Sequence, residues 1–149
     1  RERFRQLRGV KNVSPAELDE IWAALATVRA EEILGEWKGD EFHTGHRANG
    51  RLESTGWYGK TFNSVDDAKP LICRGPDGNL YSNVEIAKGE ATLWNEEFRG
   101  EVTATMVYDG CAIHDHFKRV DDDTLMGVMN GKHAPMGESG HFYFLLERV

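Results

Sequence analysis

The sequence predicts an all-β protein, an antiparallel β-barrel of about ten strands with an N-terminal α-helix. From residue 32 onward the chain consists of short segments rich in Val, Thr, Phe, Tyr and Trp, which glycine, asparagine and aspartate interrupt. The 149 residues, of which 40% are hydrophobic, can bury one core without disulfides or metals. Because antiparallel strands leave two exposed edges unless their sheet closes, we expect the sheet to form a barrel.

Residues 14–29 predict the N-terminal helix. Ser14 is a preferred N-cap, Pro15 suits the first helical position, and Glu17 completes a capping box. An apolar stripe recurs at steps of three and four residues and is formed by Leu18, Ile21, Trp22, Leu25 and Val28. We expect this stripe to lie on an apolar surface, with the helix covering one end of the barrel.

Turn signals divide the rest of the chain into candidate strands. These run over residues 34–43, 51–58, 60–63, 69–74, 79–86, 91–97, 101–109, 112–120, 123–130 and 141–148. We expect one domain over residues 1–149, in which a helical segment (1–30) precedes a first barrel part (31–100) and a second barrel part (101–149). A barrel of this size encloses a cavity where its inward side chains do not fill it.

Composition and charge narrow the classes of function. The net charge of -7 disfavours a polyanionic partner, so we expect no nucleic-acid binding. No apolar run approaches the roughly 20 residues that span a bilayer, so we expect no stable membrane insertion. Cys73 and Cys111 are too few for a disulfide framework, which favours a cytoplasmic location. The sequence leaves a homodimer open.

The segment GEWKG places a tryptophan between two glycines. Side chains alternate along a strand, so Gly35, Trp37 and Gly39 share one face, and we expect the glycines to clear space for the indole on the barrel floor. The segment resembles the start of lipocalins and fatty-acid-binding proteins, in which such a tryptophan plugs the closed end beneath an arginine of the last strand. The resemblance implies that Arg148 stacks on Trp37 by a cation–π contact worth about 0.5 to 2 kcal/mol.

Longer stretches carry a closer resemblance. They are LGEWKGDEFHTGHRANGRLESTGWYGKTF, MVYDGCAIHDHFKRVDDDTLMGVMNG and FYFLLER, within residues 20–148. They resemble a bacterial and fungal family named for its Gly-x-Trp-x-Gly (GXWXG) domain and for the domain of unknown function that follows it. The resemblance implies a single barrel of two parts, and it implies no particular activity.

The segment GWYGKTF is a candidate for ligand binding. Lys60 follows Trp57 and Tyr58, so an inward cation would lie among aromatic rings, which suits the polar head group of an amphipathic ligand. The alternative is a lysine that reaches the surface with its stem on the rings. In the preceding loop, His46 is a candidate gate at the open mouth of the barrel, or a residue that caps backbone groups.

Two histidines form a second candidate site. His114 and His116 lie two residues apart and share one face of a predicted strand. Such a pair can act as a general base or bind a metal, but a metal site needs a third ligand, which His43 or His46 would supply only if the strands meet. The alternative is a pair of polar side chains that bond to backbone or water.

Asp115 lies between these histidines on the opposite face of the strand. If it points inward, it needs Arg119, Lys60 or a histidine to offset its burial. Phe117 and Met129 are candidates for the apolar lining around such a group.

Together these residues favour a β-barrel that binds an apolar or amphipathic small molecule, such as a fatty acyl or phospholipid-like ligand, in its interior. We expect no metal or other cofactor. Two alternatives stay open. Nitrobindin-like barrels also begin with a glycine-tryptophan-glycine strand and hold haem through an axial histidine, so that resemblance implies haem binding. The other alternative is a small acid-base enzyme, an isomerase or hydrolase, that uses His114, His116 and Asp115.

Overall fold

The computed structural model describes residues 2–10, 12–46, 49–50, 54–134 and 141–149. Its helices are α1 (Glu2–Gln6), α2 (Pro15–Ala24) and α4 (Val84–Ala87), with a 3-10 turn, η1, over Ala30–Ile33. Its strands are β1 (Ala26–Thr27), β2 (Gly35–Glu41), β3 (Trp57–Ser64), β4 (Asp67–Arg74), β5 (Leu80–Ser82), β6 (Ala91–Phe98), β7 (Glu101–Tyr108), β8 (His114–Asp121), β9 (Thr124–Asn130) and β10 (Phe142–Arg148). No helix in these described ranges is long and apolar enough to cross a membrane.

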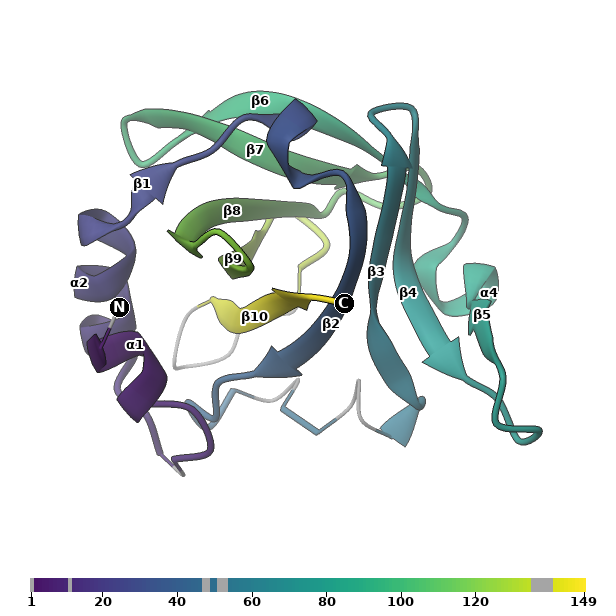
Figure 1. The fold of residues 1–149 in the computed structure, drawn as a ribbon, viewed down its shortest axis with the longest axis horizontal. Helices are drawn as coiled ribbons and strands as arrows, with labels where there is room; N and C mark the ends of the chain where they lie inside the picture. Colours follow the sequence, from purple (N-terminus) through teal and green to yellow (C-terminus); the bar gives the residue numbers. More distant parts are fainter. Residues whose placement is uncertain (1, 11, 47–48, 51–53, 135–140) are drawn as a thin grey trace.

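The strands form one closed antiparallel barrel, as predicted (Figure 1). The sheet follows the order β1-β8-β7-β6-β4-β3-β2-β10-β9, and β9 also pairs with β8, which closes the ring. β1 pairs with β8 and β5 pairs with β4 outside that ring. Strands from both predicted parts of the barrel therefore share one sheet.

Two regions of the sheet differ from the strand prediction. Residues 57–64 form the single strand β3, where we predicted separate strands at 51–58 and 60–63; residues 51–53 lie outside the described part of the chain. The predicted strand 79–86 ends at Ser82, because Asn83 starts the short helix α4 by accepting a hydrogen bond from the Ile86 backbone N–H at 3.2 Å. Asparagine is a preferred N-cap, and that local bond competes with continued strand pairing.

Helix α2 begins where the sequence predicts and ends earlier. Ser14 Oγ accepts a hydrogen bond from the Glu17 backbone N–H at 3.4 Å, and Pro15 occupies the first turn. The helix ends at Ala24 rather than residue 29, because residues 26–27 pair with β8 as the short strand β1. Sheet pairing here overrides the helical stripe in a segment that contains β-branched residues.

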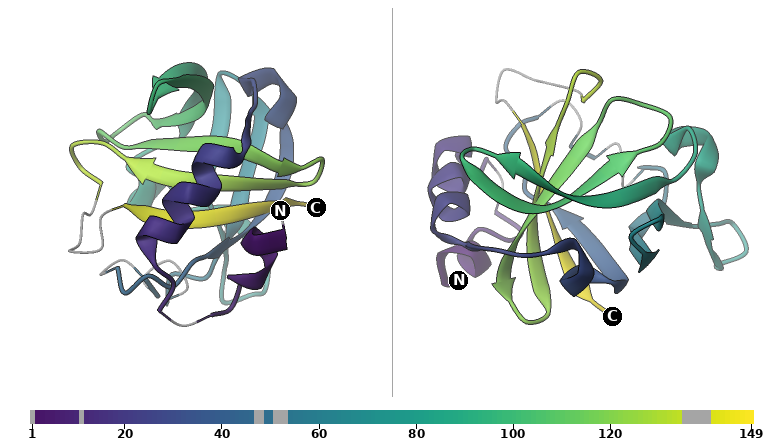
Figure 2. Two further views of the ribbon diagram at one scale, coloured as in Figure 1. Left: turned by 90° about the vertical axis from the view of Figure 1, so that its left-hand side faces the viewer. Right: turned by 90° about the horizontal axis from the view of Figure 1, so that it is seen from above.

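Helix α2 covers the outer wall of the barrel, and the prediction that it covers one end is wrong (Figure 2). Its buried residues Leu18, Ile21 and Trp22 belong to an apolar cluster between helix and sheet. The sheet contributes the outward residues Val120, Met126, Val128, Tyr143 and Leu145 to that cluster. Strands β9 and β10 are thus apolar on both faces, one toward the interior and one toward the helix.

The floor of the barrel is built around Trp37. Its indole N–H donates to the Ile33 carbonyl of η1 at 2.9 Å, and the Arg148 guanidinium lies 4.2 Å from the ring centroid. Trp37 and Arg148 are directly opposite each other in the β2–β10 pairing. The cation–π contact implied by the resemblance to lipocalins is therefore present, and the indole is 1% exposed.

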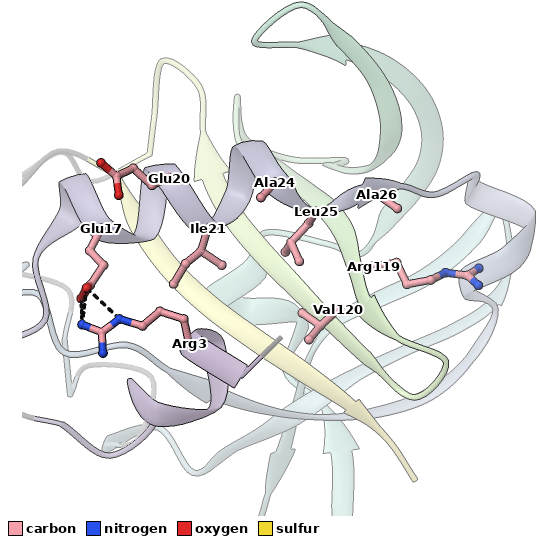
Figure 3. A pocket seen from close by; sticks show the side chains of 9 residues that line it. All are labelled: Arg3, Glu17, Glu20, Ile21, Ala24, Leu25, Ala26, Arg119 and Val120. Carbon is pink, nitrogen blue, oxygen red and sulfur yellow. Dashed lines mark hydrogen bonds and ion pairs between the residues drawn. The ribbon is translucent and has the colours of Figure 1, made fainter.

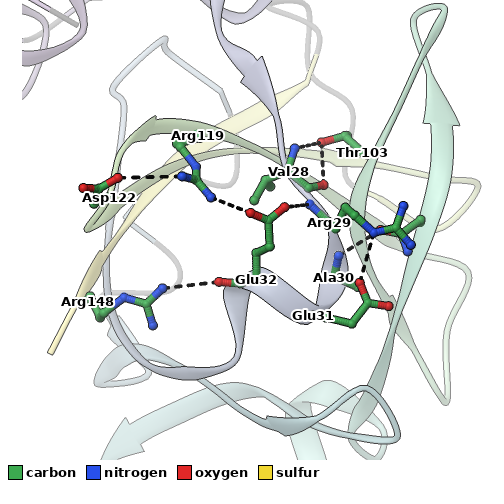
Figure 4. Close-up of polar contacts among 10 residues, drawn as sticks. Val28, Arg29, Ala30, Glu31, Glu32, Thr103, Arg119, Asp122 and Arg148 are labelled. Atoms are coloured by element: carbon green, nitrogen blue, oxygen red, sulfur yellow. Dashed lines mark hydrogen bonds and ion pairs between the residues drawn. The ribbon is translucent and has the colours of Figure 1, made fainter.

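The turn η1 is fastened to strands around this rim (Figure 4). Glu32 accepts hydrogen bonds from the Arg119 guanidinium and from the Arg29 backbone N–H, each at 2.9 Å. Arg148 donates to the carbonyls of Leu34 at 2.9 Å and Glu32 at 3.4 Å. Because these bonds reach β8 and β10 from one turn, η1 closes the end that we had assigned to the helix.

Of the glycines beside Trp37, Gly35 leaves room for the predicted arginine, whereas Gly39 leaves room for a side chain that we did not predict there. A Cβ at Gly35 would lie 3.0 Å from a guanidinium nitrogen of Arg148, and a Cβ at Gly39 would lie 2.2 Å from the indole of Trp57. The backbone that approaches Trp37 closely is that of Gly59, where a Cβ would be 1.9 Å from the Trp37 carbonyl oxygen. The motif therefore accommodates the arginine and a second tryptophan.

We predict that Arg148→Met lowers the free energy of unfolding by about 1 to 3 kcal/mol, because it removes one cation–π contact and the hydrogen bonds to two carbonyls. Urea unfolding followed by circular dichroism measures this loss. Arg74→Met is the matched control, since Arg74 is exposed and its guanidinium lies 5.5 Å from the Tyr58 ring. Equal losses in the two variants would contradict the role assigned to Arg148.

Candidate functional site

The barrel interior contains a buried ion pair between Lys60 of β3 and Asp115 of β8. Lys60 Nζ lies 3.2 Å from Asp115 Oδ2, and the two side chains are 3% and 0% exposed. Burying two charges costs several kcal/mol per ion, so such a pair needs close partners. Of the three partners that the sequence offered for an inward Asp115, the structure uses Lys60.

An irregularity in β3 brings Trp57 to the same inner side as Lys60. Residues three apart in a regular strand point to opposite faces. The β3–β4 pairing shifts register on both sides of Gly59, and this shift places both Trp57 and Lys60 against the interior. Glycine is needed at that position, because its backbone meets the Trp37 carbonyl.

Aromatic rings surround the Lys60 ammonium. It lies 5.3 Å from the centroid of Phe144, 5.7 Å from that of Trp57 and 5.8 Å from that of Tyr108. It also donates a hydrogen bond to the Pro70 carbonyl at 3.1 Å. The lysine is therefore held at its tip by several weak contacts in a place from which water is largely excluded.

Asp115 is less well satisfied than Lys60. Neither carboxylate oxygen has a well-formed hydrogen bond within the described chain, although the Lys60 ammonium and the Tyr108 hydroxyl are close enough to favour its charged form. Burial outweighs those contacts and raises the pKa of Asp115. Burial likewise lowers the pKa of Lys60 and raises that of Tyr108. The opposite pKa shifts of Lys60 and Asp115 bring two states closer in energy: the ion pair, and the neutral pair in which the proton has moved from Lys60 to Asp115.

A small cavity lies beside this group. Its volume is about 10 Å³, about enough for one water molecule. Its lining residues are Trp57, Lys60, Leu71, Tyr108, Asp115, Met129, Phe142 and Phe144. Asp115, Met129 and Phe142 are successive partners across β8, β9 and β10, so one row of the sheet forms that wall.

Trp57 separates this cavity from an outer groove. The β2–β3 pairing stops at Lys38 and Gly59, whereas β2 continues to pair with β10 as far as Glu41. Beyond that point an open groove of about 470 Å³ lies on the outside, and Trp57 lines both the groove and the inner cavity. The half-buried indole thus fills a break in the backbone wall, where its N–H donates to the Gly59 carbonyl at 3.0 Å.

The other predicted ligand-binding residues are dispersed. Phe117 points inward and packs at 5.9 Å, centroid to centroid, on both Phe62 and Phe144. His46 is buried, and the centroid of its ring lies 5.7 Å from that of Phe142. The guanidinium of Arg74 lies over the Tyr58 ring. Only Lys60, Trp57 and Met129 of the predicted set line the small cavity.

His114 and His116 lie on the face of β8 opposite Asp115. His114 Nδ1 is 2.8 Å from Glu96, and His116 stacks on Phe98 with 3.9 Å between ring centroids. The strand itself separates these rings from the interior carboxylate. The structure therefore does not bring His114, His116 and Asp115 to one substrate, as the acid-base alternative requires.

His116 is held in its neutral form. The Thr105 hydroxyl donates to the Thr103 carbonyl at 3.2 Å, so it accepts from His116 Nδ1 at 2.8 Å, while the Asn130 amide lies 3.4 Å from Nε2. Burial, and then the neighbouring His114 and other cationic groups, lower the pKa of His116 to about 4. Its ring is a packed part of the outer wall.

Among the described residues, the lining of the interior cavity includes no histidine or cysteine. A cavity of about 10 Å³ has no room for a macrocycle, and the histidine pair points away from it. Within the described ranges, no three His, Cys, Asp or Glu side chains converge in a way that could hold a metal.

A second groove lies outside the barrel between α1, α2 and β8 (Figure 3). Its volume is about 490 Å³. Arg3 and Glu17 form an ion pair at one end, Ile21 and Leu25 line the middle, and Arg119 lies at the other end. None of the described residues that line this groove is a buried charged residue. In this respect the groove differs from the Lys60–Asp115 cavity.

Sequence reasoning missed Tyr108 as a site residue. The hydroxyl lies beside Asp115 because β7 and β8 are neighbours, and Tyr108 is 7% exposed. The alternation of β7, in which Ala104, Met106 and Tyr108 all belong to the inner cluster, is the signal that could have found it.

Comparisons with known proteins match this chain in two segments and over nearly its whole length. The sequence model of a family described as "GXWXG protein" matches residues 20–78, and that of "Domain of unknown function (DUF4334)" matches residues 89–148. A solved structure, a protein from Thermomonospora curvata, is 39% identical, with a TM-score of 0.84 over 93% of this chain and 90% of that one. No curated protein sequence matches the chain.

We predict that Lys60→Met and Asp115→Leu each lower the free energy of unfolding by about 3 to 5 kcal/mol, since each leaves one buried charge without its partner. The double variant should lose less than either single variant, because neither charge remains. Urea titration gives all three values. Lys118→Met is the matched control: Lys118 is buried, but its partner Glu101 is half exposed and can be solvated. Additive losses in the double variant would contradict the pairing.

We predict that part of the acid sensitivity of the fold comes from His116. Its folded pKa of about 4 is below the ordinary 6.5, so its contribution is fully present above pH 6.5 and is lost as the pH falls toward 4. Between pH 7 and 4.5 the loss should be about 2 kcal/mol smaller in His116→Phe than in the parent, measured by urea unfolding at both pH values. An unchanged pH dependence in His116→Phe would refute the assignment.

Proposed function

The chain belongs to the GXWXG family that carries the DUF4334 domain of unknown function, and from its own site we propose that it is a small-molecule-binding barrel. The ligand is a compact amphipathic molecule whose polar end bonds to the Lys60–Asp115 pair and whose apolar body replaces the Trp57 indole. The observation that carries this proposal is a fully buried carboxylate, without a well-formed hydrogen bond, beside a cavity that one side chain closes.

The polar pair favours a ligand with an uncharged head group. Lys60 and Asp115 neutralise each other in the absence of ligand. A fatty acid would add a carboxylate and leave one net negative charge in a low-dielectric interior, which is costly. An amide, alcohol or carbonyl group can instead accept from Lys60 or donate to Asp115 without a change in net charge.

The size of the cavity favours a compact ligand. A volume of about 10 Å³ does not hold an acyl chain, and the space next to it belongs to the Trp57 indole. Rotation of Trp57 into the outer groove would vacate a space of aromatic size next to the polar pair. A fatty acyl or phospholipid-like ligand would require the inward rings of Phe142 and Phe144 to move as well, and those rings are 1% exposed.

Haem binding and acid-base catalysis by the histidine pair receive less support. Both need a histidine near the interior substrate or macrocycle, whereas His114 and His116 bond to Glu96 and Thr105 on the outer face. A cytoplasmic location is part of the proposal and rests on the low cysteine content, and a homodimer is left open.

We predict that the parent protein binds benzamide more tightly than benzoate or toluene by about tenfold, because only benzamide has an uncharged polar group that matches the pair. Isothermal titration calorimetry measures the three affinities, with decanoate as the acyl probe. Trp57→Ala should tighten benzamide binding by about tenfold or more, since the ligand no longer displaces an indole.

Two controls separate the proposed site from an artificial hole. Trp94→Ala removes a tryptophan that is 58% exposed and should leave benzamide binding unchanged. The double variant Lys60→Met/Asp115→Leu should lose the preference for benzamide over toluene. If Trp57→Ala binds toluene as tightly as benzamide, or if decanoate is the tightest ligand of the parent protein, the proposed head-group chemistry is wrong.

A further inference from the structure

We infer that Lys60 binds a carbonyl ligand covalently, as a reversible imine inside the barrel, and this rests on the proposed function. The ligand class is then a compact aldehyde or ketone with an apolar body. Two groups of complementary chemistry line one small cavity and carry the step, the Lys60 amine and the Asp115 carboxyl group, and the Tyr108 hydroxyl lies beside that carboxyl group.

The geometry supplies what imine formation needs. The amine must lose its proton before it can attack, and a carboxylate 3.2 Å away is in place to receive that proton. Desolvation among Trp57, Tyr108 and Phe144 disfavours the ammonium form of the amine. The same desolvation disfavours hydrolysis of the product, because the apolar body of the ligand, in the place of the indole, limits the access of water.

The chemistry balances with no further reactant. Asp115 takes one proton from the Lys60 ammonium, and the neutral amine forms a C–N bond to the carbonyl carbon while the C=O π electrons move to oxygen. The oxygen gains protons that pass through Asp115 and leaves as water when the C–O bond breaks. The nitrogen lone pair then completes the C=N bond, so amine and carbonyl become imine and water. Asp115 remains as the counter-ion of the protonated imine.

A second buried lysine in the same wall provides an internal comparison. Lys118 is 0% exposed, and its ammonium donates to the Trp22 carbonyl at 3.0 Å and to Glu101. It lies on the outer face of β8, between the sheet and α2, outside the interior cavity. Burial and a carboxylate are common to both lysines, so a difference in reactivity isolates the effect of the cavity.

The test is reductive trapping of the folded full chain with benzaldehyde and sodium cyanoborohydride, followed by intact-mass measurement and peptide mapping. The expected result is one benzyl group on Lys60, added about tenfold faster than on Lys118, and faster still in Trp57→Ala. Mapping in the parent protein locates the label without any variant. Label on exposed lysines with Lys60 unmodified would overturn the inference.

Lys60→Arg separates the covalent step from charge. Arginine retains a cation beside Asp115 but its guanidinium forms no such imine, so a folded Lys60→Arg protein should show no interior label, whereas Lys118→Met should be labelled as the parent is. If benzamide binds as proposed and benzaldehyde is not trapped, the imine inference fails and the proposed function stands. If neither benzamide nor benzaldehyde engages the interior, both fail.

Discussion

The ion pair between Lys60 and Asp115 is the constraint on which the interior depends. It joins β3, from the first matched segment, to β8, from the second, across the inside of one barrel. A pair of this kind contributes little net stability, because the desolvation of both ions offsets their attraction. What it imposes is geometry: β3 must present Lys60 to the interior in phase with Phe62, and the register shift at Gly59 adds Trp57 to the same side.

The floor and the cavity share a row of side chains. Trp37 is paired with Arg148 on one side and with Lys60 on the other, so one strand position links both. The two cations paired with Trp37 across the sheet differ in environment. Arg148 reaches solvent and backbone carbonyls at the rim, whereas the described partners of Lys60 are Pro70, Asp115 and aromatic rings. The contact between Trp37 and Arg148 therefore holds the floor together, and the proposed reactive group is Lys60 in the interior.

Much of the fold could be predicted from the sequence because its signals are local. Capping at Ser14, the turn residues between strands and the apolar run of β10 all depend on neighbours in the chain. The position of α2 could not be predicted, because strands β9 and β10 are apolar on both faces and only the closed barrel decides which face is outside. The prediction of a strand over residues 79–86 was wrong although the deciding signal is local. The N-cap at Asn83 can be read from neighbouring residues, but we gave more weight to the β-rich composition.

The candidate site was predicted only in part. The arrangement of Trp57 beside Lys60 and the presence of Tyr108 were not predicted. Lys60, Trp57, Met129 and the option of a Lys60–Asp115 pair follow from residue types, but a regular strand would have placed Trp57 and Lys60 on opposite faces. The irregularity at Gly59 brings them together, and no periodic pattern contains it. Tyr108 depends in addition on the pairing of β7 with β8.

The GXWXG motif acquires a second role from this arrangement. Its first glycine borders Arg148, its tryptophan sits on the floor, and its second glycine, Gly39, gives the Trp57 indole its place. A side chain at Gly39 would overlap an indole that is rigid and half buried, so the indole, and not the floor, would have to move. A single seven-residue strand thus fixes the closed end of the barrel and also shapes the break through which its interior meets the outer groove. Because the break is filled by a side chain and not by paired backbone, opening it requires a rotation of Trp57 and leaves the hydrogen bonds of the closed ring intact.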